Sequence, residues 1–188
     1  MKGEKITMRK LVAGLFISLD GVVESPDRWQ MPFFNDEMGT AVGSLMAAGD
    51  TLLLGRRTYE EFAAFFAGAT GVPTAEQMNN TPKVVVSTTL DRATWQNSTL
   101  IGGNVAEEIT RLKQQPGKDI NISGSATLIR SLLRDHLLDE IHLLVHPIVV
   151  GTGKRLFEEM GEQVALRLAD AQTFSTGVLH LTYVPERP

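Results

Sequence analysis

Short apolar segments with strand character alternate with segments of helical periodicity along nearly the whole chain, and this alternation limits the possible folds more than any other feature. Lys83–Ser87 contains three consecutive valines without polar alternation, which is typical of a strand buried on both faces of a parallel sheet. Near the end of the chain, Val164–Leu168 and Val178–Val184 alternate apolar with polar residues, which favours an antiparallel pair. The sequence therefore predicts an α/β sandwich with a mostly parallel sheet and antiparallel strands at its C-terminal edge.

The other expected elements follow in regular order. Further strands are expected at Leu11–Ser18, Thr51–Leu54, Leu100–Ile101, Ile120–Ile122 and Glu140–Val150. Helices are expected from Asn35 or Asp36 to about Ala48, from Thr58 to Phe66, after Asn104 and after Ser125. The polar stretches Asp20–Pro32 and Gly68–Pro82 predict loops.

Composition limits the possible functions. A length of 188 residues with 43% hydrophobic residues fits one domain over residues 1–188, with residues 1–8 expected as a disordered leader. The absence of cysteine excludes disulfide scaffolds, thiolate catalysis and cysteine-ligated zinc, and it fits a cytoplasmic location. A formal net charge of −4 provides no positive field for nucleic acid or an anionic membrane, so the expected partner is a small molecule.

Two local patterns imitate other functions. Leu11–Leu19 follows several basic residues as a secretory leader would, but it ends at Asp20 without a small-residue cleavage site, so a buried strand explains it better. No stretch approaches the ~18 apolar residues of a membrane span. His142 and His146 suggest a metal pair, yet on one strand they would lie about 13 Å apart, and no metal is expected.

Three expected strand ends carry glycine, hydroxyl or basic residues. They are Gly55-Arg56-Arg57-Thr58, Ser87-Thr88-Thr89 and Ser123-Gly124-Ser125-Ala126-Thr127. Glycine lets backbone N–H groups approach oxyanions, a helix start directs unpaired N–H groups outward, and arginine offers a two-pronged donor. If the sheet brings the three segments to one edge, they form a site for a ligand with several phosphate groups. Each segment alone is better explained as an ordinary turn or helix cap, and only their combination favours a ligand site.

The same segments resemble the dihydrofolate reductase superfamily. Leu52–Glu60 (LLLGRRTYE) resembles its strand and GRxT-aromatic-Glu signature, and Trp29–Pro32 (WQMP) resembles its W-x-L-P loop. Ile120–Leu128 resembles its glycine-rich turn into a helix. Ser18–Gly21 (SLDG) is similar to the stand-alone branch related to the reductase domain of riboflavin biosynthesis. The resemblance covers nearly the whole chain and implies the dihydrofolate reductase-like three-layer sandwich.

What this resemblance implies is an NADPH-dependent reductase that transfers a hydride to a small heterocyclic or carbonyl-like substrate. Carried over residue by residue, the cofactor site would comprise Ala13 beside the nicotinamide, Gly55, Arg56, Arg57 and Thr58 at the phosphates, Ser87 and Thr88 near the 2′-phosphate, and Gly124, Ser125, Ala126 and Thr127 over the pyrophosphate. A 2′-phosphate needs a guanidinium and hydroxyls, whereas an NAD site would prefer a carboxylate, so NADPH is predicted over NADH. The resemblance also implies a possible homodimer and a cis peptide bond between Ser123 and Gly124.

The substrate side departs from the resembling families. Phe34 occupies the place of the carboxylate that holds the pterin in dihydrofolate reductases, and the substrate motifs of the riboflavin reductase domain are replaced as well. Asp20 is the first candidate for the proton donor and Asp36 the second, although Asp20 is also explained as a turn residue. Trp29, Phe33 and Phe34 are candidates for the wall of an apolar substrate pocket, or for the core. The alternatives are a nucleotide-binding module without turnover and a true dihydrofolate reductase.

Overall fold

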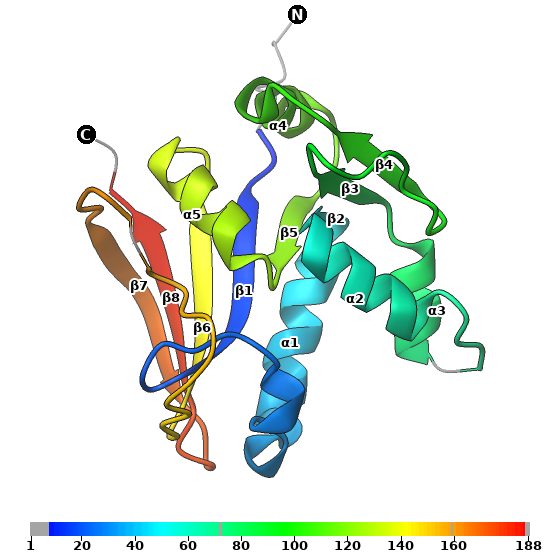
Figure 1. Cartoon of the computed structure of the whole chain (residues 1–188). Helices are drawn as coiled ribbons and strands as arrows, with labels where there is room; N and C mark the ends of the chain where they lie inside the picture. The colour runs from blue at the N-terminus through cyan, green and yellow to red at the C-terminus, as the bar shows by residue number, and fades with distance from the viewer. Residues whose placement is uncertain (1–7, 72, 159, 187–188) are drawn as a thin grey trace, which may run out of the picture.

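One sheet of eight strands forms the centre of the molecule (Figure 1). The structure is a computed structural model that describes residues 8–71, 73–158 and 160–186, so residues 1–7 of the expected leader lie outside the described residues. The strands are β1 (Leu11–Ser18), β2 (Gly49–Gly55), β3 (Lys83–Val86), β4 (Ser98–Ile101), β5 (Asp119–Ser123), β6 (Glu140–His146), β7 (Leu166–Thr173) and β8 (Leu179–Pro185). Their order across the sheet is β4-β3-β2-β5-β1-β6-β8-β7.

Six neighbouring strands, from β4 to β6 in this order, run parallel, and β8 pairs antiparallel with both β6 and β7. The predicted fold class is therefore confirmed, including the antiparallel strands at the C-terminal edge. The helices are α1 (Asp36–Ala48), α2 (Arg56–Phe66), α3 (Pro73–Asn80), α4 (Val105–Gln114) and α5 (Ala126–Arg134), with short 3-10 turns at Pro26–Arg28 and Met31–Phe33.

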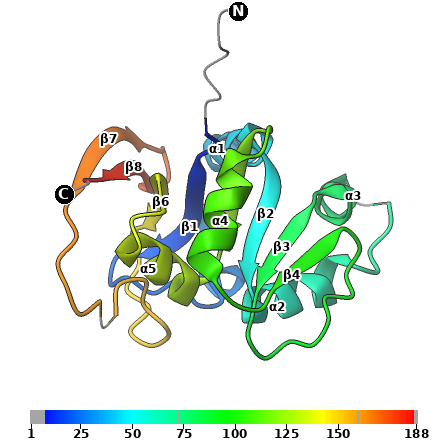
Figure 2. The same cartoon turned by 90° about the horizontal axis from the view of Figure 1, so that it is seen from above.

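Helices cover both faces of the sheet. Ile109 of α4 and the apolar stripe of α5 pack against alternate residues of β1, β5 and β6. Met38 of α1 packs on the opposite face near Phe16 and Leu144, while α2 and α3 cover β2 and β3 around Tyr59. In Figure 2, α1 and α5 lie on opposite sides of β1 and β6. This arrangement gives the three layers that the resemblance implies.

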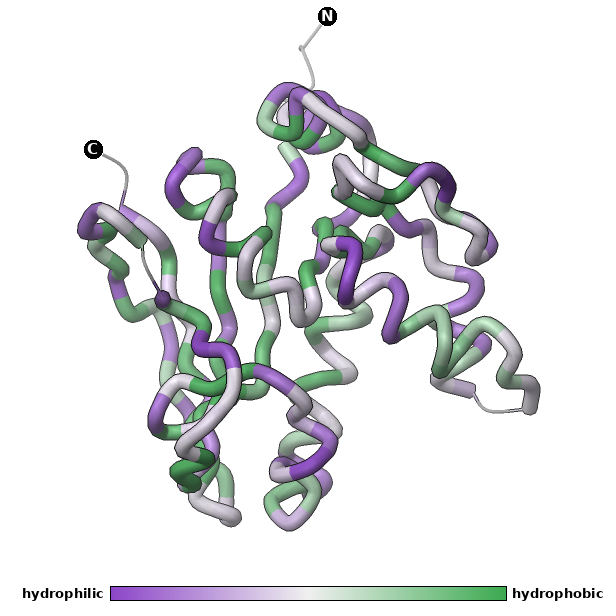
Figure 3. The backbone as a smooth tube through the Cα atoms, in the orientation of Figure 1, coloured by the Kyte–Doolittle hydropathy of each residue, from purple (hydrophilic) through white to green (hydrophobic). Residues whose placement is uncertain are grey.

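The hydropathy of the strands matches their position. Figure 3 shows hydrophobic segments along β1 and β6, and on β6 they are interrupted by hydrophilic residues. These interruptions are Glu140, His142 and His146, which lie on the face of β6 that α1 covers rather than on the face that α5 covers. None of the described helices is long and apolar enough to cross a membrane.

Several expected elements differ in their details. Helix α3 occupies most of the stretch that was expected to be a loop, because Ala75 and Met78 bury its inner face and Pro73 suits its first turn. Strand β7 begins at Leu166 and continues to Thr173, since its pairing with β8 extends beyond a bulge after Leu168. The prediction for 164–168 therefore identified the strand but placed it too early in the chain.

Candidate active site

Because β1, β2, β3, β5 and β6 are parallel, their carboxyl ends meet at one edge of the sheet. At this edge the turn from β2 into α2 contacts the turn from β5 into α5. The Gly55 N–H donates to Ser125 Oγ at 2.9 Å, and the Ser125 N–H and Oγ each donate to Thr58 Oγ1 at 3.0 Å. Two of the three predicted phosphate-binding segments are thus joined by direct hydrogen bonds.

The third segment lies beside the other two. Arg56 Nη1 donates to Thr89 Oγ1 at 2.8 Å, which joins the start of α2 to the chain after β3. Ser87 Oγ accepts hydrogen bonds from the N–H groups of Thr89 and Leu90 at 3.2 and 3.0 Å, and Ser87 is buried. Thr88 is exposed. The predicted convergence of the three segments is therefore present at one edge.

Gly124 permits the close approach of the two joined turns. Its φ of +58° is in the left-handed region, and a Cβ built there would lie 3.0 Å from both Cγ2 and Oγ1 of Thr58. Ser125 also has a positive φ, of 54°. All peptide bonds between described residues are trans, so the expected cis bond before Gly124 is wrong; the two left-handed residues form the turn instead.

The helices that begin at this edge leave backbone donors available. Asn35 caps α1 by accepting a hydrogen bond from the Met38 N–H at 3.0 Å. By contrast, Gly55, the N-cap residue of α2, has no side chain, and the side chain of Ser125, the N-cap residue of α5, makes no capping hydrogen bond. Unpaired N–H groups and the positive end of the helix dipole favour an anion at such a position. The two helix starts therefore fit a ligand with a phosphate chain.

The predicted cofactor residues differ in what they offer to a ligand. The exposed ones are Arg56, Arg57, Thr88 and Thr127, and the half-exposed ones are Gly55, Gly124, Ser125 and Ala126. Thr58 and Ser87 are buried, so their hydroxyl groups hold the turns in position. Ala13 is fully buried in the core beneath α5, where no surface of it remains for the nicotinamide ring.

Asp20 joins the end of β1 to the chain that follows β6. Its carboxylate accepts hydrogen bonds from Ser18 Oγ at 2.7 Å and from the N–H groups of Val150 and Gly151 at 3.0 and 2.9 Å. Arg155 Nη2 lies 3.6 Å from the same carboxylate. The hydrogen bond from Ser18, followed by those from the two N–H groups, lowers the pKa of Asp20 to about 2. These contacts suit an ionised anchor better than a proton donor at neutral pH.

The aromatic candidates do not gather around a cavity. The rings of Trp29 and Phe33 pack edge-on against His146 with centroid distances of 5.2 and 5.7 Å, and Trp29 is 7% exposed. Phe34 is 46% exposed. The first two therefore pack in the core, which is one of the two places expected for them, and of the three rings only that of Phe34 is exposed.

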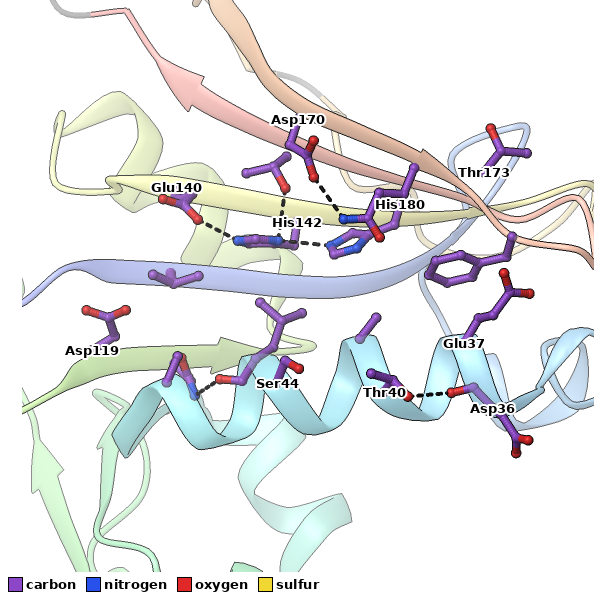
Figure 4. A pocket seen from close by; sticks show the side chains of 18 residues that line it. Asp36, Glu37, Thr40, Ser44, Asp119, Glu140, His142, Asp170, Thr173 and His180 are labelled. Atoms are coloured by element: carbon purple, nitrogen blue, oxygen red, sulfur yellow. Dashed lines mark hydrogen bonds and ion pairs between the residues drawn. The ribbon is translucent and has the colours of Figure 1, made fainter.

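A cavity of about 770 Å³ lies between α1 and the face of the sheet formed by β1, β5, β6, β8 and β7 (Figure 4). Asp36 and Glu37 line the end near the first turn of α1, and Asp119 lies toward its other end. Figure 4 shows the Glu37 side chain directed toward the cavity and the Asp36 carboxylate directed away from it. Of the residues proposed from sequence for chemistry, Asp36 alone lines this cavity.

Hydrogen-bonded polar side chains form the sheet wall of the cavity. His142 Nε2 lies 2.6 Å from Glu140 Oε1, and His142 Nδ1 lies 3.0 Å from His180 Nε2 and 3.2 Å from Thr182 Oγ1. Gly14 pairs with Ser123 on one side and with His142 on the other. At the usual strand spacing, His142 is therefore about 10 Å from the end of β5, where the turn into α5 begins.

Sequence reasoning did not find this wall. His142 was considered only with His146 as a metal pair, and the structure separates them: His146 is fully buried among aromatic rings. His142 meets His180 through the antiparallel pairing of β6 with β8, in which His142 is opposite Thr182. The alternation His180-x-Thr182 is visible in the sequence, but the register that brings it to His142 is not.

The comparisons with known proteins agree with this geometry. The family model for the RibD C-terminal domain matches residues 9–180. The chain belongs to this family. The uncharacterised protein YyaP of Bacillus subtilis is 29% identical to this protein over 183 residues, which cover 95% of this chain and 96% of YyaP.

Solved structures establish the fold. A protein of Shewanella sp. PV-4 named for riboflavin biosynthesis has a TM-score of 0.79 at 22% identity, covering 95% of this RibD C-terminal domain and 99% of that chain. Dihydrofolate reductase from Enterococcus faecalis, solved with NADP(H), has a TM-score of 0.59 at 18% identity, covering 95% and 97% of the two chains. The resemblance stated from sequence is thus confirmed at the level of family and fold, and the family supports a reductase-like role.

Proposed function

We propose that this protein is an NADPH-dependent reductase that transfers a hydride to a small heterocyclic or carbonyl-like substrate. The observation that carries the proposal is the meeting of two helix starts without side-chain caps, with Arg56 and Arg57, at one edge of a sheet of this family. The dihydrofolate reductase of the same fold was solved with NADP(H), which supports a nicotinamide cofactor here. A cytoplasmic location and a homodimer are part of the same proposal.

The residues at the edge fit NADPH in a specific way. The N–H groups that begin α5, at Ala126 and Thr127, would hold the pyrophosphate, and the exposed Arg57 with Thr88 would meet the 2′-phosphate. Arg57 has only long ion pairs, 3.6 Å to Glu24 and 3.4 Å to Glu61, so its guanidinium can turn to a phosphate at small cost. When bound, NADPH supplies the hydride.

The chain itself must position the substrate, exclude water and provide a proton path. The cavity beneath α1 provides the space, and its wall residue His142 is about 10 Å from the end of β5. Asp36 lines this cavity at the exposed start of α1; its carboxylate is directed outward, and a rotation of the side chain would let it pass a proton from solvent into the cavity. We propose Asp36 for this role and assign Asp20 to anchoring the loop after β6.

A titration of the protein with NADPH and with NADH tests the cofactor. NADPH should bind more tightly, and Arg57→Ala should weaken NADPH about tenfold or more while leaving NADH unchanged, because it removes a charge-assisted contact to the 2′-phosphate. Arg111→Ala on α4 is the matched control, since both side chains are 65% exposed and paired with glutamates. Equal affinity for both cofactors would contradict NADPH preference.

Turnover needs a separate measurement. Nicotinamide absorbance should fall when NADPH is mixed with some member of a panel of pterins, pyrimidines and quinones. NADPH binding without oxidation across the whole panel would instead identify a nucleotide-binding module that has no turnover.

A further inference from the structure

The cavity beneath α1 has a wall made of hydrogen-bond acceptors. The Glu140 carboxylate can only accept from His142 Nε2, at 2.6 Å, so His142 carries its proton on Nε2 when the ring is neutral. His142 Nδ1 is then the acceptor for the N–H of His180 Nε2, at 3.0 Å, and for the Thr182 hydroxyl. In this series of hydrogen bonds, the Nε2 protons of His142 and His180 both lie inside the wall and point toward Glu140.

The second nitrogen of His180 completes the pattern. His180 is 8% exposed and lines the cavity, and with its proton on Nε2 its Nδ1 is an acceptor that has no hydrogen-bond partner among the described residues. Burial, followed by the electrostatic interaction with His142, lowers the pKa of His180, so the neutral ring is the form at neutral pH. An acceptor without a protein partner in the wall of an open cavity is available to a donor from a ligand or from water.

The charge of the cavity also favours a ligand that donates hydrogen bonds. Five acidic residues line it: Asp36, Glu37, Asp119, Glu140 and Asp170. All but Asp36, whose carboxylate is directed away, can present a negative charge to it, and the described lining contains no lysine or arginine. For Glu140, burial would raise the pKa, but hydrogen bonds from Lys10 and His142 bring it below the usual value. Hydrogen bonds from Ser175 lower the pKa of Glu37 as well. At neutral pH the cavity is therefore negative.

The nearest cations are outside the lining and already have partners. Lys10 Nζ lies 3.1 Å from Glu140 Oε2, and Lys118 Nζ donates to the Ala47 carbonyl at 3.3 Å. Arg56 and Arg57 are at the carboxyl edge of the sheet, at the start of α2, and do not line the cavity. A phosphate placed in the cavity would thus meet carboxylates and unprotonated ring nitrogens, with no free cation among its described lining residues.

We infer that the cavity takes a neutral or positively charged ring that carries amine or amidine donors and no phosphate. This inference rests on the proposed function in one respect: it makes such a ring the substrate class of the reductase. Amidine and amine N–H groups would pair with Glu140, Asp170 and His180 Nδ1, which are all acceptors. Members of the fold that act on phosphorylated substrates would need a cationic lining that this cavity lacks among its described residues.

A pair of probes with one shape and opposite charge tests the inference directly. Benzamidine, which is cationic at pH 7, and benzoate are titrated separately into the full chain and followed by backbone amide NMR. Benzamidine should bind at least tenfold more tightly and shift the amides of α1 and β6. Equal or tighter binding of benzoate, or benzamidine shifts confined to other elements, would overturn the inference.

Two variants locate the contact. Glu140→Gln and Asp170→Asn should each weaken benzamidine at least threefold, because each removes one negative acceptor while preserving its shape. Asp170 is on the exposed edge strand β7, so its variant tests the inference even if Glu140→Gln fails to fold. Glu107→Gln, on α4 and outside the cavity lining, should change nothing. Unchanged benzamidine affinity in Asp170→Asn would contradict the assignment.

The same samples separate this inference from the proposed function. If NADPH binds but benzamidine shows no preference over benzoate, the substrate class is wrong and the reductase proposal stands. If benzamidine binds in the cavity but NADPH does not bind at all, the cofactor proposal fails while the chemistry of the cavity stands.

Discussion

Lys83 shows how a single buried charge ties the start of β3 to its surroundings. It is 1% exposed, and its Nζ donates to the carbonyls of Asn79, Thr81 and Gln96 at 3.3, 2.6 and 3.2 Å. The ammonium also lies 4.2 Å from the centroid of the Trp95 ring. These carbonyls and the indole replace water around the charge, and no carboxylate accepts a hydrogen bond from it among the described residues.

Stability should therefore rise with pH in the alkaline range. Burial lowers the pKa of Lys83 to about 8, whereas an unfolded lysine has a pKa of about 10.4. Between these values the unfolded chain binds more protons, so the free energy of unfolding should increase by up to about 1.4 kcal/mol per pH unit. Urea unfolding at pH 8 and pH 10 measures this change. Lys83→Met should abolish this increase in the free energy of unfolding between pH 8 and pH 10, and Lys154→Met, at an exposed site, should preserve it. If the increase persists in Lys83→Met, burial of Lys83 is not its cause.

At the scale of elements, the turn from β5 into α5 has the strictest geometry. Gly124→Ala would place a methyl group 3.0 Å from Thr58 atoms at a left-handed φ, which should cost about 1 to 3 kcal/mol of folding free energy. The same change should weaken NADPH, because it separates the two turns that face the ligand. Gly103→Ala is the control, since no atom lies within 4 Å of its added Cβ. Denaturation and NADPH titration of both variants measure the two effects; equal losses in both would show that the turn has no special role.

The elements also show what the sequence could predict. Strands β1, β3 and β5 could be predicted because a continuous run of apolar residues indicates a buried strand. The glycine and hydroxyl residues of the turns lie within a few positions of those runs. Helix α3 was missed because only Ala75 and Met78 of its residues are buried, too few to give a helical period.

The candidate site also has a part that the sequence predicts and a part that it does not. The strand-end turns were predictable, since each is local in sequence and parallel strands bring their ends together. The bonds of Asp20 to Val150 and Gly151 span about 130 residues, and the contact of His142 with His180 depends on the pairing register of β6 and β8. Neither partner can be read from a local pattern, so the anchoring role of Asp20 and the acceptor wall emerged only from the fold.

At the scale of the whole molecule, the sheet separates two chemistries. Its carboxyl edge collects the backbone donors at the starts of α2 and α5 together with Arg56 and Arg57, while the face beneath α1 collects carboxylates and histidines from β5, β6, β7 and β8. An anionic dinucleotide and a donor-bearing ring would thus bind at separate places about two strands apart. The net charge of −4 does not reveal this separation, because a net charge does not show where the charged residues lie in the fold.

The proposed function requires that one ligand contacts both turns at the carboxyl edge. Hydrogen–deuterium exchange of the full chain with and without NADPH measures this most directly. NADPH should slow exchange in residues 55–58 and in residues 123–128 together, and leave α4 unchanged. Protection of only one of these segments, or of neither, at a saturating NADPH concentration would contradict the central claim.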